Sequence, residues 1–202
     1  MYKNNYGGLF VVFDGPNGAG KSTLIKGVEK VLLDRGIEVY ITTEPSTTEV
    51  GNFTRKISET IDSASLACLV AADRYHHIEN EIKPQLMKKQ VVISDRYLLS
   101  SLILQRMDGI DTEFILAINS KILLPNIQIA VTADEQIIAS RLEKRNERTR
   151  FEQDGCVAQE LKFLKSGVDI LRNLGVRVER VDNTRSLDKN IEYLVCCILE
   201  AV

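Results

Sequence analysis

The most constraining feature of the sequence is the segment Leu9–Thr23. It consists of an apolar run followed by a glycine-rich loop, and a helical pattern comes after it. The run Leu9–Phe13 is typical of a buried strand, and Leu24–Leu33 is typical of a helix. Between them the order G-x-x-x-x-G-K-S extends from Gly15 to Ser22. Glycines allow a loop to turn its N–H groups inward, and the next helix aims further N–H groups at the same point. The segment therefore predicts a polyphosphate site.

Two side chains at the end of this segment have specific chemical uses. Lys21 is placed to reach the outer phosphates, and the Ser22 hydroxyl is placed to bind Mg²⁺. Strand, loop and helix occur in the order that the motif requires, which disfavours a chance match in a glycine-containing turn. The residues predicted to bind the phosphates are Gly15, Asn17, Gly18, Ala19, Gly20, Lys21, Ser22 and Thr23.

Composition narrows the class of protein. The 202 residues are 44% apolar and 27% charged, which suits one soluble globular domain. A formal net charge of −2 gives no overall basic field, so no nucleic-acid partner is expected. Neither a long apolar span nor a secretory pattern is present, so no membrane association is expected. The four cysteines lack metal-ligand spacing, and a reducing cytoplasm is the expected location.

Strand and helix patterns alternate along the whole chain. Near-continuous apolar strands such as VVIS and IQIAV indicate a sheet buried on both faces and therefore parallel. The expected fold is a three-layer α/β/α P-loop NTPase domain with a five-stranded parallel sheet, formed as one domain by residues 1–202. Strands are expected at Leu9–Asp14, Glu38–Thr42, Val91–Asp95, Ile127–Thr132 and Val176–Val181. Helices are expected at 21–35, 50–61, 65–89, 97–107, 111–124, 134–145, 156–174 and 187–201.

In such sheets the ligand binds beyond the carboxyl ends of the strands, so the residues that follow each strand are candidates. Glu44 follows the second strand; it could contact a substrate hydroxyl or the metal shell, act as a general base, or be a solvated turn residue. The third strand ends in Asp95 and Arg96. Asp95 is predicted to hold Mg²⁺, with helix capping as the alternative, and Arg96 to bind an acceptor phosphate.

A basic cluster extends from Arg141 to Arg150. Arginines on a small mobile lid, expected around residues 142–155, can stabilise a phosphoryl group during transfer and exclude water. The alternative is a charged helix face with i,i+4 pairs. The adjacent His76 and His77 point in different directions on a helix, so they are poor joint metal ligands and no chemistry is assigned to them.

Together these motifs resemble those of the thymidylate kinases over nearly the full length of the chain. The A-A-D-R segment and the D-R pair after the third strand are more specific than the phosphate loop alone. The matching segments are FDGPNGAGKST; TTEPSTTEVGNFTRKI, with Glu44, Pro45, Thr48, Gly51 and Arg55; LVAADRY, with Asp73 and Arg74; DRYLLSSLILQ, with Asp95, Arg96, Tyr97, Ser100 and Gln105; and RTRFEQD, with Arg150, Phe151 and Glu152.

The resemblance implies a nucleoside monophosphate kinase that transfers the γ-phosphoryl group of ATP to dTMP with Mg²⁺ bound. It also implies a homodimer, for which Leu98–Leu104 and Ile110–Leu124 are candidate contact stretches. The implied catalytic residues are Lys21, Arg96, Arg145, Arg148 and Arg150. Besides the loop, the resemblance places Arg141 against adenine, and it places Ser22 and Asp95 on the metal. The implied acceptor contacts are Asn17, Glu44, Arg74, Arg96, Ser101 and Gln105.

The departures from the family pattern fall on the acceptor side. Val70 stands where an aromatic ring stacks on thymine, Leu104 replaces a tyrosine, and Asn17 replaces a loop carboxylate that meets the sugar 3′-hydroxyl. Stacking on a base contributes roughly 1–3 kcal/mol, so the acceptor affinity is expected to fall tenfold or more. The other replaced positions are Thr43, which replaces an arginine, and Ser46 and Thr47, which replace two glycines.

Several alternatives stay open at this stage. A deoxynucleoside kinase has a similar T-E-P turn, in which the glutamate takes the proton of a 5′-hydroxyl. A nucleotide kinase with altered acceptor specificity, or a non-catalytic nucleotide-binding homologue, would also fit the altered pocket. A regulatory GTPase would need an N-K-x-D guanine motif, which the sequence lacks.

Overall fold

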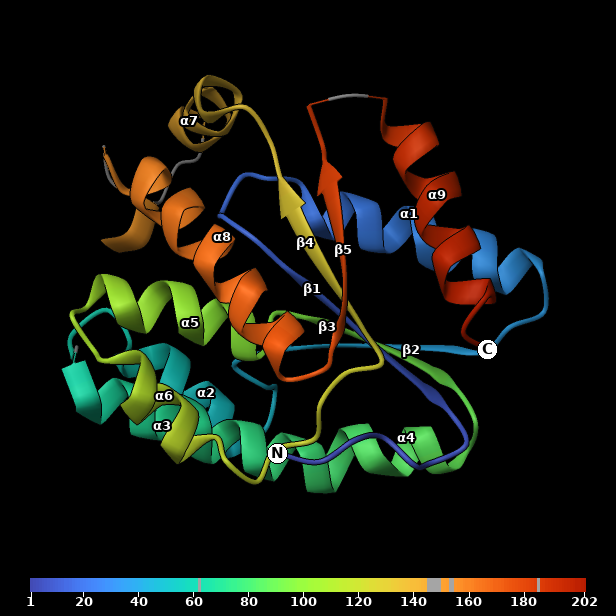
Figure 1. Cartoon of the computed structure of the whole chain (residues 1–202), viewed down its shortest axis with the longest axis horizontal. Helices are drawn as coiled ribbons and strands as arrows, with labels where there is room; N and C mark the ends of the chain where they lie inside the picture. The colour runs from blue at the N-terminus through green and yellow to red at the C-terminus, as the bar shows by residue number, and fades with distance from the viewer. Residues whose placement is uncertain (62, 145–149, 153–154, 185) are drawn as a thin grey trace.

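The protein is built around a parallel sheet of five strands in the order β2-β3-β1-β4-β5 (Figure 1). The computed structural model describes residues 1–61, 63–144, 150–152, 155–184 and 186–202. The five-stranded parallel sheet confirms the predicted α/β fold, and each strand begins and ends within one residue of its expected bounds. The strands are β1 (Leu9–Asp14), β2 (Val39–Thr43), β3 (Val91–Asp95), β4 (Ile127–Thr132) and β5 (Arg177–Asp182).

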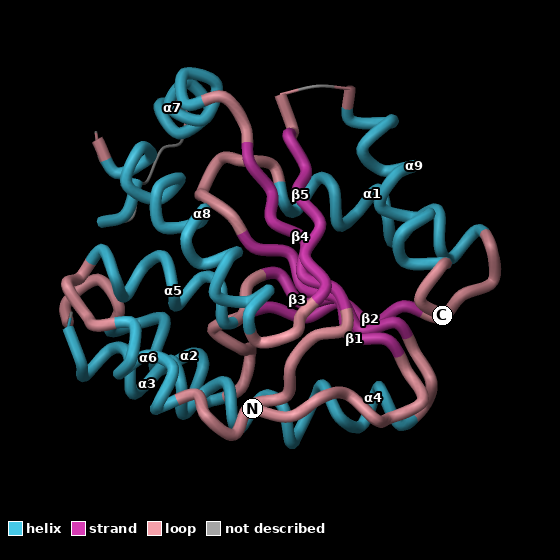
Figure 2. The backbone as a smooth tube through the Cα atoms, in the orientation of Figure 1, coloured by secondary structure: helices cyan, strands magenta, loops and turns pink. Residues whose placement is uncertain are grey.

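Helices cover both faces of the sheet, which gives three layers (Figure 2). The side chains of β1 alternate between two cores: Val11 and Phe13 pack with α1 and α9, whereas Phe10 and Val12 pack with α5 and α8. A strand buried on both faces explains the unbroken apolar run in the sequence. The helices are α1 (Lys21–Asp34), α2 (Glu49–Ile57), α3 (Ser63–His77), α4 (Lys83–Met87), α5 (Leu98–Met107), α6 (Thr112–Ile118), α7 (Glu135–Glu143), α8 (Cys156–Asn173) and α9 (Leu187–Leu199).

Three expected helices differ from the observed ones; the helix expected over 50–61 is α2, which ends at Ile57. The helix expected over 111–124 ends at Ile118, because the following segment pairs with the N-terminus through Tyr2 N–H to Ile122 O at 3.1 Å and Leu124 N–H to Tyr2 O at 2.8 Å. The helix expected over 65–89 contains a π turn, η1 (Ile78–Ile82), between α3 and α4. Pro84 lies just after this turn and lacks an N–H for the regular ladder, which a widened turn accommodates.

No helix in the described ranges is long and apolar enough to cross a membrane. The C-terminal ends of β1, β2 and β3 lead into the phosphate-loop segment, Glu44 and Arg96, respectively, so the fold gathers the candidate residues at one edge of the sheet.

Candidate active site

A first cavity of about 540 Å³ lies at the glycine-rich loop after β1. Its lining comes from the loop with the start of α1, the end of β3, α7, and the segment between β5 and the start of α9, so four separate segments meet there. The sequence-predicted residues Gly15 and Ala19 shape the loop without lining this cavity. The lining residues are Asn17, Gly18, Gly20, Lys21, Ser22, Thr23, Asp95, Arg96, Arg141, Asn183, Thr184 and Leu187.

Two loop positions require glycine for steric reasons. Gly15 has φ +153°, and a Cβ there would lie 2.1 Å from Val131 O. Gly20 has φ +91°, and a Cβ there would lie 2.2 Å from Asn183 Nδ2. The same Asn183 amide donates to Ala19 O at 2.9 Å. Asn183, which directly follows β5, therefore holds the loop in place through this hydrogen bond. The loop shape therefore depends on close approach as well as on positive φ.

Lys21 is almost fully buried beneath the loop. Its Nζ donates to Gly15 O at 2.9 Å and to Pro16 O at 3.0 Å. Burial, with the nearby Arg96 guanidinium adding to it, lowers the pKa of Lys21 to about 7. An incoming anion would reverse that shift, because it would favour the ammonium form.

Ser22 and Asp95 form a pair of oxygen ligands at the mouth of the cavity. Ser22 Oγ donates to Asp95 Oδ2 at 3.1 Å, whereas Asp95 Oδ1 is buried and has no hydrogen-bond partner among the described residues. A buried carboxylate oxygen without a partner fits a hard cation such as Mg²⁺. No cluster of three or more His, Cys, Asp or Glu side chains occurs in the described chain, so phosphates and water would complete the coordination.

Arg96 stands between the first cavity and a second one, because it and Asn17 line both. Its backbone has φ +79°, a conformation that is uncommon for a non-glycine residue, and is held by Arg96 N–H to Phe13 O at 2.8 Å. Its Nη2 donates to Asn17 Oδ1 at 2.5 Å and its Nη1 to Ser100 Oγ at 3.0 Å. The guanidinium is thus fixed where the two cavities meet.

The second cavity, of about 370 Å³, lies under α2, α3 and α5. Predicted acceptor residues Glu44, Arg74, Ser101 and Gln105 all line it, so the structure brings them together with Asn17 and Arg96. Gln105 Oε1 is buried without a hydrogen-bond partner in the described residues, which leaves an acceptor for a ligand N–H. Other lining residues are Thr43, Pro45, Thr54, Arg55, Ser58, Glu59, Leu66, Val70, Tyr97, Ser100, Leu104, Phe151 and Glu152.

Arg74 is 1% exposed and forms one wall of the second cavity. Its Nε donates to Glu44 Oε2 at 2.8 Å, and its carbon Cζ lies 5.0 Å from the centre of the Tyr97 ring. Further bonds run from its Nη atoms to Asn119 Oδ1, Tyr97 O and Ser101 Oγ. Four of its five N–H groups are therefore engaged within the described chain, which leaves one for a ligand.

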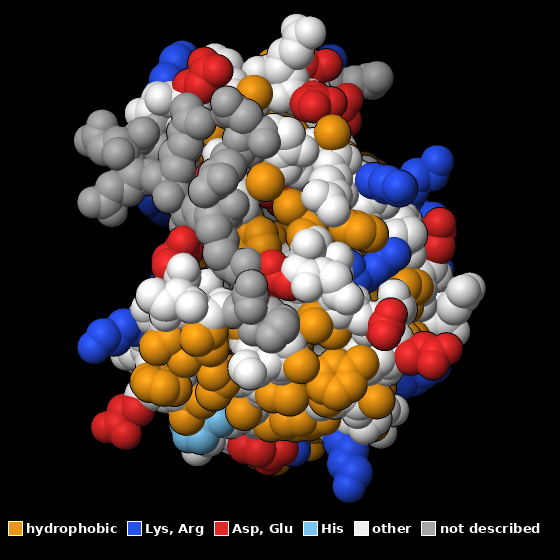
Figure 3. All heavy atoms as spheres, turned by 90° about the vertical axis from the view of Figure 1, so that its left-hand side faces the viewer, with side chains coloured by type: hydrophobic (Ala, Val, Ile, Leu, Met, Phe, Trp, Pro, Cys, Tyr) orange, Lys and Arg blue, Asp and Glu red, His pale blue; other side chains and the backbone are white. Residues whose placement is uncertain are grey.

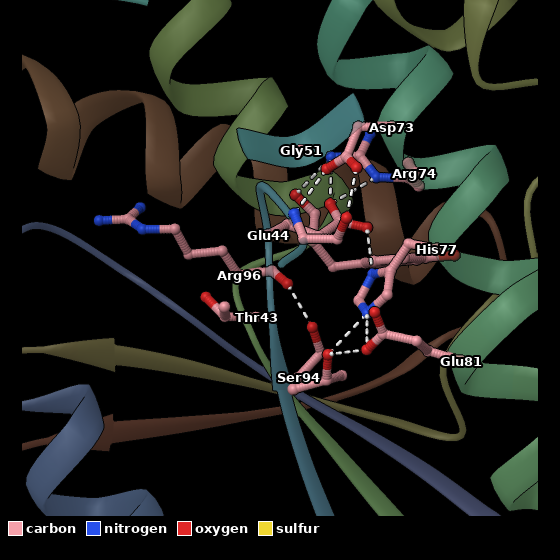
Figure 4. A network of polar contacts seen from close by, with 12 residues as sticks. Thr43, Glu44, Gly51, Asp73, Arg74, His77, Glu81, Ser94 and Arg96 are labelled. Atoms are coloured by element: carbon pink, nitrogen blue, oxygen red, sulfur yellow. Dashed lines mark hydrogen bonds and ion pairs between the residues drawn. The ribbon is translucent and has the colours of Figure 1, made fainter. Parts of the chain in front are cut away.

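Glu44 is buried, with 4% exposure, so its interpretation as a solvated turn residue is wrong. Its two carboxylate oxygens face different partners, Arg74 at 2.8 Å and His77 Nδ1 at 3.4 Å (Figure 4). A buried carboxylate that is ion-paired on one oxygen is a structural acceptor rather than a free base.

Comparison with known proteins decides the family. The family model described as thymidylate kinase matches residues 13–168. The chain belongs to the thymidylate kinase family. It is 37% identical over 150 residues to a probable thymidylate kinase of Caldivirga maquilingensis, an alignment that covers 72% of this chain and 73% of that protein. It is 37% identical over 155 residues to a thymidylate kinase of Caldicellulosiruptor saccharolyticus, covering 73% of this chain and 75% of the relative.

Half of the lid expected around residues 142–155 falls on residues that the structure does not describe. Arg145 and Arg148 lie outside the described residues, as does the side chain of Arg150, whose backbone begins a 3-10 turn, η2 (Arg150–Glu152). Arg141 lies on α7, and its Nη1 donates to Gly18 O at 3.1 Å. The beginning of the basic cluster therefore touches the phosphate loop.

Glu160 is a buried acid that the sequence analysis missed. It lies on α8, is 1% exposed, and accepts the backbone N–H of Asn17. Burial raises the pKa of Glu160 to about 7, although the positive charges of Arg96 and Lys21 oppose that rise. The sequence contains a sign of this burial: Glu160 lies between Val157 and Leu164 on the apolar face of α8, where a glutamate is unusual.

This environment predicts that Glu160→Gln stabilises the protein in a pH-dependent way. The folded-state pKa of about 7 exceeds the ordinary 4.5, so ionised Glu160 opposes folding increasingly above pH 4.5 and most above pH 7. We expect the variant to unfold about 5 °C higher at pH 8, with no difference near pH 4.5. Thermal unfolding from pH 4.5 to 8 measures this, and an equal shift at all pH values would contradict it.

Proposed function

We propose that the protein transfers the γ-phosphoryl group of ATP to dTMP, which gives dTDP and ADP. The observation that carries this proposal is the position of Arg96, which lines a polyphosphate-type cavity on one side and a base-sized cavity on the other. Two nucleotides bound there would meet at this guanidinium. The names of its relatives in the thymidylate kinase family support the same reaction.

On the donor side, ATP phosphates would lie along the loop N–H groups and Lys21, with Arg141 beside the adenine. Lys21 would follow the phosphoryl group during transfer, since its ammonium lies directly under the loop. Ser22 and Asp95 would hold Mg²⁺, which would neutralise phosphate charge and orient the two outer phosphates.

On the acceptor side, Arg96 would bind the dTMP phosphate bidentately and hold it in line with ATP. The remaining N–H of Arg74 suits a carbonyl oxygen of the base, and Gln105 Oε1 suits the thymine N3–H. Ser101 and Glu44 would complete the pocket by fixing Arg74, and Asn17 would lie near the sugar. The lid arginines Arg145, Arg148 and Arg150 are proposed to close over the phosphates and exclude water.

The alternative of a deoxynucleoside kinase requires Glu44 to accept a proton from a 5′-hydroxyl. Its ion pair with Arg74 counts against that role. A non-catalytic homologue is also disfavoured, because Lys21, Ser22, Asp95 and Arg96 are all present and converge on the first cavity. Transfer to a monophosphate acceptor needs no general base, since a phosphate oxygen is already a nucleophile.

A panel of acceptors tests the proposed function. We expect ADP release with dTMP to exceed that with dCMP or dAMP by at least about tenfold in kcat/KM, because the ring nitrogen at the pairing edge of cytosine or adenine carries no hydrogen and leaves the buried Gln105 acceptor unpaired. Thymidine serves as the nucleoside control. Faster turnover with thymidine would favour the nucleoside kinase, and ATP binding without turnover on any acceptor would favour the non-catalytic homologue.

The proposal extends to a homodimer in the cytoplasm. Apolar side chains gather on the side of the molecule that carries α2, α5 and α6, where Phe53 and Phe114 are 54% and 38% exposed (Figure 3). Of the candidate contact stretches, Leu98–Leu104 packs mainly in the core of the single chain, so exposed positions on α2 and α6 are better candidates. All four cysteines are free thiols, in keeping with a reducing compartment.

A further inference from the structure

His77 is a fully buried histidine at the end of α3 to which the sequence pattern gave no role. Both ring nitrogens face the end of β2: Nδ1 faces Glu44 Oε1 at 3.4 Å, and Nε2 lies 2.7 Å from Thr42 Oγ1 (Figure 4). Glu81 adds a second acidic group, with Oε2 3.6 Å from Nε2 and 3.0 Å from Thr42 Oγ1. The imidazole is thus clamped at both nitrogens.

The proton on the Glu44 side can be assigned from the chemistry of the partners. A carboxylate that is ion-paired with Arg74 has only acceptor oxygens, so His77 Nδ1 must supply the hydrogen of the contact. Thr42 Oγ1 has a single hydrogen, which it donates to Nε2 if only Nδ1 is protonated and to Glu81 Oε2 if both ring nitrogens are protonated. In either case Thr42 and Glu81 fix the opposite edge of the ring. A hydrogen bond of 3.4 Å is long, as is common in sites that tighten when substrate binds.

Glu44 is the anionic partner of Arg74 in the described chain, whereas the other three partners, Asn119, Ser101 and the Tyr97 carbonyl, are neutral. The direction of the Glu44 carboxylate therefore has a large influence on the direction of the guanidinium. Arg74 binds one oxygen of the Glu44 carboxylate and His77 binds the other. His77 therefore fixes the plane of the carboxylate, and the carboxylate orients the Arg74 guanidinium.

We propose that His77 is a positioning residue for the acceptor cavity, because its Nδ1–H fixes Glu44 and, through Glu44, the Arg74 guanidinium at the cavity wall. This inference rests on the proposed function for the identity of the acceptor. It does not need His77 to touch substrate, and it predicts that the Nδ1 side of the ring matters more to the acceptor than the Nε2 side.

Two isosteric variants separate the two sides of the ring. In His77→Asn the amide nitrogen can occupy the position of Nδ1, and in His77→Gln it can occupy the position of Nε2. We expect His77→Asn to keep the KM for dTMP within about threefold of the parent, and His77→Gln to raise it about tenfold. The KM for ATP is expected to change less than about twofold in both. The matched control is His76→Gln, which alters an exposed neighbour on the same helix.

A readout without substrate keeps this test separate from the proposed function. The ¹H–¹⁵N signal of Arg74 Nε, assigned with Arg74→Lys, reports how well the guanidinium is held. We expect slow hydrogen exchange at this group in the parent and His77→Asn, and exchange at least about tenfold faster in His77→Gln. Equal exchange rates in all three proteins would overturn the positioning role. So would equal increases in KM for dTMP in both variants that accompany equal losses of melting temperature. Absence of dTMP turnover in the parent would instead contradict only the proposed function.

Discussion

Replacing Lys21 by alanine is expected to lower kcat by about 10³-fold while the fold is retained. The ammonium is held under the loop by Gly15 O and Pro16 O, so in the proposed function it lies beside the place where phosphate charge would develop. Removing one such preorganised donor typically costs 10²–10³ in rate, and a full charge gives the upper end of that range. A coupled ADP-release assay at saturating ATP and dTMP measures the loss.

Stability provides the control for this substitution, with Lys21→Met as the isosteric variant. The folded-state pKa of about 7 lies below the ordinary 10.5, so protonated Lys21 opposes folding fully below pH 7, and this effect disappears as the pH rises to 10.5. Lys21→Met is therefore expected to melt higher than the parent at pH 6, with the gain shrinking toward pH 10. Near-normal turnover of either variant would contradict the role of Lys21.

The parts of the site that depend on local sequence were predictable. The glycine spacing from Gly15 to Gly20 predicted the loop and the start of α1 from local sequence, whereas the close contacts of these glycines with Val131 and Asn183 depend on tertiary packing. Asp95 and Arg96 follow an apolar strand, and parallel strands bring their carboxyl ends to one edge. Their pairing with Ser22 and Asn17 followed from that topology.

The parts that depend on long-range packing were not predictable. Nothing next to Glu44 in the sequence indicates that Arg74, thirty residues later, would bury it. The same holds for Ser46, which stands at a departure from the family pattern: its N–H and Oγ bind Asp73 at 2.7 and 2.6 Å, so a serine in place of glycine gains a buried partner. The end of α6 was missed for the same reason, since the N-terminal residues that compete for this segment lie far away in the sequence.

The acceptor departures are partly compensated by this buried network. Thr43, which replaces an arginine, donates from Oγ1 to Asp95 O at 3.0 Å and so steadies the end of β3 beside the proposed metal ligands. Val70 and Leu104 leave an aliphatic wall in the second cavity, where Phe151 is the aromatic residue that remains besides Tyr97. In the proposed function, recognition of the base would therefore depend more on hydrogen bonds with Arg74 and Gln105 than on stacking.

Arg96→Ala is expected to raise the KM for dTMP about 10²-fold, with the KM for ATP changed less than about threefold. A fixed guanidinium that binds a phosphate in a partly buried site contributes a few kcal/mol, and 1.4 kcal/mol corresponds to tenfold. Arg96 also lines the ATP cavity, but the loop N–H groups and Lys21 remain to bind those phosphates. Initial rates with each substrate varied in turn measure the two constants.

The matched control for Arg96→Ala is Arg172→Gln, which removes an equal charge from an exposed position on α8. The control should leave both constants unchanged, because a distant surface charge is screened by solvent and salt. The decisive quantity is the ratio between the two changes in KM. If Arg96 binds the acceptor phosphate, its removal should raise the KM for dTMP about thirty-fold more than the KM for ATP. Loss of both affinities by the same factor would show that Arg96 serves the loop through Asn17 instead.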